Sequence, residues 1–267
     1  MESSNPILSR YARNGRGYAS MGNPNVGTTG YSTSYDAVEG KELEDIYNAP
    51  AASPMQTGRM TMDDVVTRTA MLFGLLVVTS AFAWQVALGG VALFGSFAIA
   101  LVLGMVIAFS RKVRPALILV YAGLQGVVLG SISRIYEAVY PGIVSQALLA
   151  TAGAFVGVLF AYRTGRIRIT ARATKFALAA IIGYLVLGII NIFGGNFIFN
   201  GTFGPFVALF GVGLATFFLA MDFDQAAKAV AIGVPQQESW RVGFGMMVSV
   251  IWLYLEVLRL LSILRRD

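Results

Sequence analysis

The chain has 267 residues, of which 56% are hydrophobic and only 13% are charged, and its mean hydropathy is +0.68. A soluble domain is about 25% charged, so this composition excludes a water-soluble globule and indicates an integral membrane protein. The sequence contains no Cys and no His, which excludes disulfide bonds, thiolate or imidazole metal sites and histidine-dependent catalysis. Proton-sensitive chemistry must therefore rest on the 14 Asp and Glu residues.

Residues 1–60 differ in composition from the rest of the chain. They are rich in Gly, Ser, Asn and Tyr and have no sustained apolar period, which predicts a disordered cytoplasmic tail. Residues 61–267 are then one transmembrane domain. Two roles for the tail stay open, a passive solvated segment or a docking arm. The docking arm would use four tyrosines, Tyr18, Tyr31, Tyr35 and Tyr47.

Long apolar segments follow the tail and predict an all-α bundle of seven transmembrane helices. A spanning helix needs roughly 20 mostly apolar residues. Segment 176–221 carries no charge and is too long for one span, so its Gly- and Asn-rich part, 194–205, is expected to divide it in two. The other five predicted spans are 69–88, 91–110, 116–133, 138–162 and 242–264.

The basic residues between the spans predict the orientation. Lys and Arg favour the cytoplasmic side, and a cytoplasmic N-terminus places most loop Lys and Arg there. The pI of about 9.7 is thus explained by charge that faces cytoplasm and anionic lipid, without a nucleic-acid partner. Arg265 and Arg266 would then lie outside, against the rule. A re-entrant last segment with a cytoplasmic C-terminus stays open as the alternative.

Glycines recur at helical spacing in three of the predicted spans. Such stripes let helix backbones approach closely in lipid, and we expect them to be packing surfaces. They are Gly123, Gly126 and Gly130 in the third span, Gly153 and Gly157 in the fourth, and Gly183 and Gly188 in the fifth.

Acidic residues within the apolar segments are the main functional candidates, because a charge at the membrane centre costs at least about 2.5–3.5 kcal/mol. Asp222 has no charged residue one helical turn away, whereas Asp224 has Lys228 at i+4 and is expected to form an ordinary ion pair. The helix that carries both is expected to continue to residue 232 and to stop at Gly233. Asp222 therefore needs a partner from another helix.

Glu256, deep in the last span, is the expected partner of Asp222, because the two helices are consecutive and antiparallel. Two such carboxyls would share a proton and titrate as a pair. Deprotonated, they would repel each other and offer oxygen ligands to a passing Ca²⁺ ion. This hypothesis makes Asp222 and Glu256 a pH sensor and gate without a bound cofactor. The alternative for Glu256 is an i,i+3 pair with Arg259.

Several sequence segments, in the order in which they occur along the chain, resemble the Bax inhibitor-1 family (TMBIM, YccA) over about residues 65–267. The tail and the long turn at 236–239 resemble those of bacterial members, actinobacterial ones in particular, which implies a bacterial plasma membrane. The resemblance rests on YAGLQGVVLG at 121–130, GIV at 142–144, ALLATA at 147–152, MDF at 221–223, and LYLE at 253–256 followed by LRLL at 258–261.

The resemblance implies a seven-helix protein with a pH-sensitive Ca²⁺ leak and an acidic pair on helices 6 and 7. Asp222 matches the helix-6 aspartate, and Glu256 stands where the family has a second aspartate. Gln125 stands where some relatives carry Glu, and Arg111 is a candidate for a helix-2 arginine of the family. With Asp224 and Arg259, these two residues are secondary site candidates.

Two functions compete at this point. One is a pH-sensitive cation leak channel, and the other is a regulatory protein that binds another membrane protein, such as a membrane protease, without conducting ions. An enzyme is not expected, because the sequence has no HExxH, GxSxG or intramembrane aspartyl-protease motif. Besides the lipid bilayer, the expected partner is another membrane protein.

Overall fold

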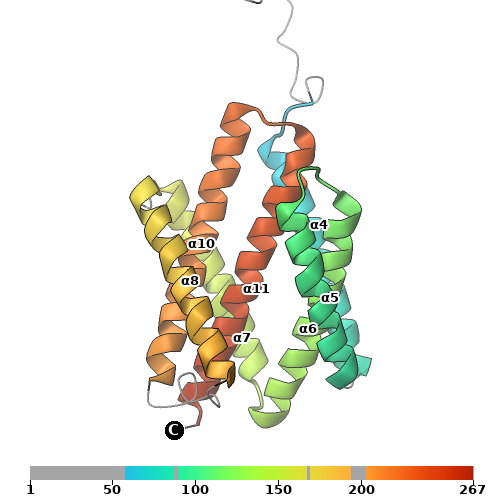
Figure 1. Cartoon of the computed structure of the whole chain (residues 1–267), viewed down its shortest axis with the longest axis vertical. Helices are drawn as coiled ribbons and strands as arrows, with labels where there is room; N and C mark the ends of the chain where they lie inside the picture. Colours follow the sequence, from blue (N-terminus) through green and yellow to red (C-terminus); the bar gives the residue numbers. More distant parts are fainter. Residues whose placement is uncertain (1–57, 87–89, 167–168, 194–202, 267) are drawn as a thin grey trace, which may run out of the picture. The chain divides into compact units, whose positions relative to one another are not determined.

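The computed structural model describes residues 58–86, 90–166, 169–193 and 203–266, and these ranges are helical apart from short turns and one isolated bridge (Figure 1). Of the predicted tail, 1–60, residues 1–57 lie outside the described residues, as do residues 194–202 of the predicted division at 194–205. The last three residues of the predicted tail are described, and Gly58 and Met60 form backbone bonds with the α10–α11 connection. In chain order the helices are α4 (Met62–Val86), α5 (Gly90–Phe109), α6 (Pro115–Val139), α7 (Ile143–Arg163), α8 (Ala171–Phe193), α10 (Gly204–Ile232), the 3-10 turn η1 (Gln236–Glu238) and α11 (Ser239–Leu264).

Within the described ranges, six helices are long and apolar enough to cross a membrane, which confirms a helical polytopic membrane protein. The six are α4, α6, α7, α8, α10 and α11, with η1 counted into the last span. The seventh helix, α5, contributes a shorter apolar stretch, Leu93–Phe109. The total of seven spans therefore stays a prediction.

Two helix boundaries have clear causes in the sequence. α4 begins earlier than the apolar pattern predicts, because the Asp64 carboxylate accepts bonds from the Thr61 N–H (3.0 Å) and hydroxyl (2.7 Å) while the Asp64 N–H donates to Thr61 Oγ1 (3.1 Å). This reciprocal arrangement caps a helix N-terminus. α10 continues to Ile232 and ends at Gly233, as predicted, where φ is 73°, a left-handed conformation that favours glycine.

α4 and α6 approach closely through two glycines of the predicted stripe. A Cβ atom added at Gly126 would lie 2.4 Å from the Leu76 carbonyl oxygen, and one at Gly130 would lie 2.2 Å from the Ser80 carbonyl oxygen. Both distances are far below van der Waals contact, so the packing prediction is confirmed at these positions. It is wrong for Gly153, Gly157 and Gly183, where an added Cβ would meet nothing within 4 Å in the described structure.

α11 is the central helix of the bundle and packs against α4, α6, α7 and α10 (Figure 1). Met247, Leu253 and Leu258 on this helix are fully buried. α5 packs on α6 and α8 packs on α10, so these two lie farther from the centre. Their outward faces expose large apolar residues, such as Val91 on α5 and Phe176 on α8, which suits a surface solvated by lipid.

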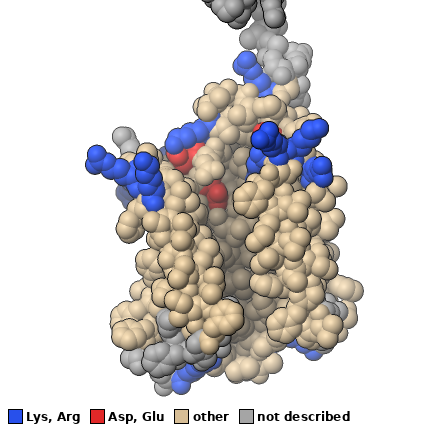
Figure 2. Space-filling model, in the orientation of Figure 1, with Lys and Arg blue, Asp and Glu red and all other residues tan. Residues whose placement is uncertain are grey.

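The two ends of the bundle differ in charge. Most Lys and Arg side chains visible in Figure 2 gather at the end where Figure 1 places the α10–α11 connection. α11 crosses from that end as one continuous helix of 26 residues, about 39 Å long at 1.5 Å per residue. Arg265, just after it, donates 2.8 Å to the Pro141 carbonyl in the α6–α7 turn. α11 is therefore one uninterrupted helix of spanning length, and the side of the membrane on which its C-terminus lies stays a prediction.

The chain that enters α4 is tied to the α10–α11 connection. The Met60 N–H donates to the Val234 carbonyl at 2.8 Å, and the Gln236 N–H donates to the Gly58 carbonyl at 2.8 Å. Arg68 also donates to the Gln236 carbonyl and lies over the Trp240 ring, 5.4 Å from its centroid. These contacts fix the start of α4 beside the loop that joins the two acidic helices.

Candidate functional site

Asp222 lies on α10, ten residues before the helix ends at Ile232, and faces α11. The hydroxyl of Ser249, a buried residue of α11, donates to Asp222 Oδ2. The small residue Gly245, one turn before Ser249, lets the carboxyl approach the helix, because a Cβ there would lie 3.3 Å from Asp222 Oδ1. The half-buried Asp222 side chain thus links α10 to α11 by a hydrogen bond from a neutral hydroxyl.

Glu256 is 6% exposed and belongs to a dense hydrogen-bonded cluster. Its Oε1 atom accepts from the Tyr184 hydroxyl of α8 at 2.5 Å and from the Trp252 indole N–H at 3.0 Å. Its Oε2 atom lies 2.7 Å from Arg259 Nη2, which also donates to the Tyr184 hydroxyl at 2.7 Å. We call these four residues the Glu256 cluster.

Gly211 of α10 makes the Glu256 cluster sterically possible. A Cβ atom added at Gly211 would lie 2.6 Å from Glu256 Oε2 and 2.7 Å from the Tyr184 hydroxyl. Both distances are far below van der Waals contact, so α10 approaches the carboxylate only because this residue lacks a side chain. Three helices, α8, α10 and α11, therefore meet around one ion pair.

The structure does not bring Asp222 and Glu256 together as the sequence predicted. In the described part of the chain, Asp222 bonds to Ser249 while Glu256 bonds within its own cluster, and no hydrogen bond joins the two carboxyls. Ser249 precedes Glu256 by seven residues, or about two turns and about 10 Å along the helix. The alternative prediction for Glu256, an i,i+3 pair with Arg259, is confirmed.

A model of the family described as Bax inhibitor 1 like matches residues 5–266 of the chain. The chain belongs to the Bax inhibitor 1 like family. A comparison with curated proteins found no match. The family match confirms the resemblance inferred from the motifs at 121–130, 221–223 and 253–256, and it agrees with the helical membrane architecture.

In this Bax inhibitor 1 like protein the secondary candidates have separate surroundings. Asp224 pairs with Lys228 one turn later, as predicted. Gln125 donates 2.9 Å to the Tyr121 hydroxyl within α6. Arg111 is exposed in the α5–α6 connection, where its backbone carbonyl accepts a long bond of 3.5 Å from Arg241.

The described residues contain no group of three or more acidic side chains that could hold a metal ion. A transient Ca²⁺ contact at Asp222 and Glu256 stays a prediction. The two carboxyls would differ as Ca²⁺ ligands, because their neighbours differ in charge. Oε2 of Glu256 faces a guanidinium at 2.7 Å, whereas Asp222 faces a neutral hydroxyl.

Sequence reasoning missed five residues of these two sites, one of which is Gly245 beside Asp222. Trp252 stands at i−4 and Ser249 at i−7 from Glu256, so helical spacing alone places both on the same face of α11. Gly211 and Tyr184 carry no comparable signal, because they come from other helices and only the packing brings them to Glu256.

Proposed function

We propose that this protein is a pH-sensitive cation leak channel in which protonation of Asp222 controls the contact between α10 and α11. One observation supports this proposal above the others. Asp222 is an acidic side chain on a spanning helix, and its partner across the interface is the neutral Ser249 hydroxyl. The carboxylate of Glu256, by contrast, already has a cationic partner in Arg259.

At low pH the Asp222 carboxyl is neutral and can exchange hydrogen bonds with Ser249 as donor or acceptor. A neutral pair suits the lipid-facing bundle, because no charge has to be desolvated. α10 and α11 then stay packed along the surface formed by Asp222, Gly245 and Ser249. This is the closed state.

At higher pH the proton leaves and Asp222 becomes a carboxylate that can accept about four hydrogen bonds. Ser249 supplies one of them. Water and a hard cation such as Ca²⁺ would supply the rest, because carboxylate oxygens are preferred Ca²⁺ ligands. Hydration of the charge separates α10 from α11 locally, and cation flux rises with pH.

The Glu256 cluster acts in this proposal as the fixed end of the same interface. Two bonds of Tyr184, one to Glu256 at 2.5 Å and one from Arg259 at 2.7 Å, hold α11 to α8, while the ion pair and the Trp252 bond lie within α11. Because a buried ion pair is costly to expose, the bundle stays packed around Glu256 and opens at the Asp222 end. Glu256 is then a structural anchor, and the carboxyl that titrates is Asp222.

The proposal also includes the membrane topology. We infer seven spans, with α5 as the second, in a bacterial plasma membrane. The basic end in Figure 2 supports the orientation with a cytoplasmic N-terminus. Asp222 then lies about 15 Å along α10 from its cytoplasmic end at Ile232, since each residue adds 1.5 Å. The proton that controls the leak would come from the cytoplasm.

Ca²⁺ uptake by proteoliposomes at a series of pH values tests the proposed function. The wild type should show uptake that rises from acidic to alkaline pH. Asp222→Asn should remove the pH dependence, because its amide cannot ionise. Asp224→Asn is the matched control, two residues away and already paired with Lys228, and it should behave as the wild type. Absence of protein-dependent uptake at every pH would reject a leak and favour the regulatory, non-conducting function.

A further inference from the structure

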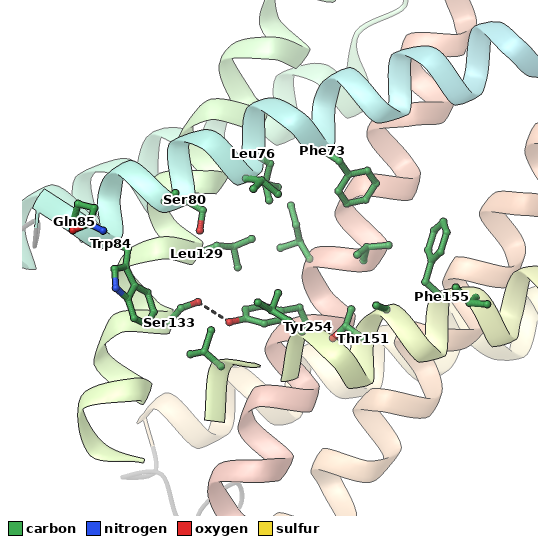
Figure 3. A pocket seen from close by; sticks show the side chains of 18 residues that line it. Phe73, Leu76, Ser80, Trp84, Gln85, Leu129, Ser133, Thr151, Phe155 and Tyr254 are labelled. Atoms are coloured by element: carbon green, nitrogen blue, oxygen red, sulfur yellow. Dashed lines mark hydrogen bonds between the residues drawn. The ribbon is translucent and has the colours of Figure 1, made fainter. Parts of the chain in front are cut away.

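A cavity of about 720 Å³ lies between α4, α6, α7 and α11 (Figure 3). Neither Asp222 nor Glu256 lines it, so it is separate from the two acidic sites. Its volume falls within the range of roughly 300–1,000 Å³ typical of small-molecule sites. Its described lining carries no charged side chain and is mostly apolar, with four aromatic residues, Phe73, Trp84, Phe155 and Tyr254.

The cavity opens sideways, toward the region that lipid would occupy. At its edge, Val77 of α4 is 61% exposed, and Leu148 and Val156 of α7 are 56% and 62% exposed. Its inner wall is formed by buried residues of the other two helices, such as Leu129 and Ile251. A molecule dissolved in the bilayer could therefore enter between α4 and α7 without passing through water.

Thr151 of α7 has an unused hydrogen-bonding group at this cavity. The residue is 6% exposed, and its Oγ1 atom has no hydrogen-bond partner in the described structure. Helical threonines commonly donate to the carbonyl one turn earlier, as Thr79 does to Leu75 (2.9 Å) and Thr216 does to Val212 (2.7 Å). The Thr151 hydroxyl is instead buried without an acceptor among the described residues, on a residue that lines the cavity.

A second hydroxyl hydrogen comes from the pair formed by Ser133 of α6 and Tyr254 of α11. Their oxygens are 2.7 Å apart, and both residues are buried. Whichever hydroxyl donates within the pair, the other keeps its own hydrogen. Figure 3 shows this bond at the cavity wall, with Thr151 projecting from a different helix. The cavity thus offers hydrogen-bond donors from more than one helix, and its described lining carries no charge.

The depth of Thr151 narrows the class of ligand. Thr151 follows the start of α7 at Ile143 by eight residues, or about 12 Å. This depth approaches the middle of a hydrocarbon core about 30 Å thick. A phospholipid keeps its charged headgroup at the surface, and the cavity has no cation to draw a phosphate inward. A neutral lipid can reach this depth with its polar group.

We propose that the cavity binds a neutral bilayer lipid that carries carbonyl oxygens, with the Thr151 hydroxyl donating to one of them. The acyl chain or chains occupy the apolar part between Val77 and Val156. The Ser133–Tyr254 pair offers the second donor. Buried hydroxyls without a partner are costly, and this ligand gives Thr151 its missing acceptor.

Photo-crosslinking of the full-length protein in phospholipid nanodiscs tests the proposal, with a diacylglycerol that carries a diazirine in one acyl chain as the probe. Labelled peptides should come from the cavity faces of α4 and α7, and unlabelled diacylglycerol should compete. A phosphatidic acid with the same photoreactive chain is the charged counterpart and should label these peptides at least about fivefold less. Equal labelling by both probes would overturn the proposal, because the cavity would then be a nonselective groove for lipid chains.

Two pairs of variants locate the ligand. Thr151→Val keeps the shape and removes the hydroxyl, and labelling should fall about threefold to tenfold, as expected for one lost hydrogen bond. Thr216→Val is its control, because Thr216 already bonds to Val212. Ala152→Trp fills the cavity and should abolish labelling, while Leu149→Trp places the same ring on the lipid-facing side of α7, where Leu149 is 75% exposed. Unchanged labelling of either Thr151→Val or Ala152→Trp would contradict the assignment.

Discussion

The α10–α11 interface holds two acidic side chains whose charges have opposite kinds of surroundings, one with a cationic partner and one with a neutral partner. Glu256 is surrounded by a cation, a phenol and an indole, all within 3.0 Å. Asp222 has a serine hydroxyl. The comparison teaches that an acidic residue within a span is not by itself a sensor. Its partners decide whether its charge is fixed or free to change.

The energetic consequences of the two environments differ. A buried ion pair is tolerated only when further hydrogen bonds satisfy the remaining polar atoms, and Tyr184 and Trp252 provide them for Glu256. Removal of one member leaves a buried charge without compensation. Asp222 faces a neutral hydroxyl, so gain or loss of its proton breaks no ion pair.

Loss of the cation from the Glu256 cluster should give the largest effect. Arg259→Met leaves a buried carboxylate without its counter-charge and should destabilise the protein by about 3–5 kcal/mol. Thermal unfolding of the detergent-solubilised protein measures this as a lower midpoint. The double variant Arg259→Met with Glu256→Gln should recover part of the loss, because no charge is then buried. A double variant less stable than Arg259→Met would contradict a structural ion pair.

The close approach of α10 to Glu256 predicts the next largest effect. Gly211→Ala places a methyl group 2.6 Å from Glu256 Oε2, and overpacking of this kind typically costs about 1–3 kcal/mol. Gly213→Ala is the matched control on the same helix, since nothing lies within 4 Å of its added Cβ. The same thermal unfolding experiment compares them. Equal midpoints for the two variants would mean that Gly211 is not needed for the contact.

The smallest effect should come from the Asp222 contact, and it should appear in function rather than stability. Ser249→Ala removes a donor that stabilises the charged carboxylate. The midpoint of pH-dependent Ca²⁺ uptake should therefore move to higher pH, by up to about one unit for a bond worth about 1 kcal/mol. The unfolding midpoint should change little. A midpoint shifted to lower pH would reverse the assigned role of Ser249.

The sequence was sufficient for the helical membrane class, the family, the end of α10 at Gly233 and the Asp224–Lys228 pair, because each depends on local pattern or helical spacing. It could not place the partner of Asp222. The depths of two antiparallel helices depend on their relative shift, and a shift of about two turns exchanges Glu256 for Ser249 opposite Asp222. Nor could it reveal Tyr184, which reaches Glu256 only through the packing of α8 on α10.

The glycine stripes of α6 and α7 also show that sequence spacing alone does not determine how helices pack. Glycine spacing predicted close packing in both regions, yet an added Cβ meets Leu76 at Gly126 and nothing at Gly153 or Gly157. Small residues permit a close approach in lipid but do not require one. Whether a neighbouring helix packs closely against these glycines depends on contacts elsewhere in the bundle.

The most direct test of the central claim compares the pH dependence of Ca²⁺ uptake in Asp222→Asn and Tyr184→Phe proteoliposomes. Tyr184→Phe removes the bond to Glu256 and the bond from Arg259 but leaves the ion pair between these two residues, so the cluster is perturbed without separating its charges. We predict that uptake becomes independent of pH in Asp222→Asn and keeps the wild-type pH dependence in Tyr184→Phe. A pH dependence that survives in Asp222→Asn and disappears in Tyr184→Phe would assign the sensor to the Glu256 cluster and contradict the account.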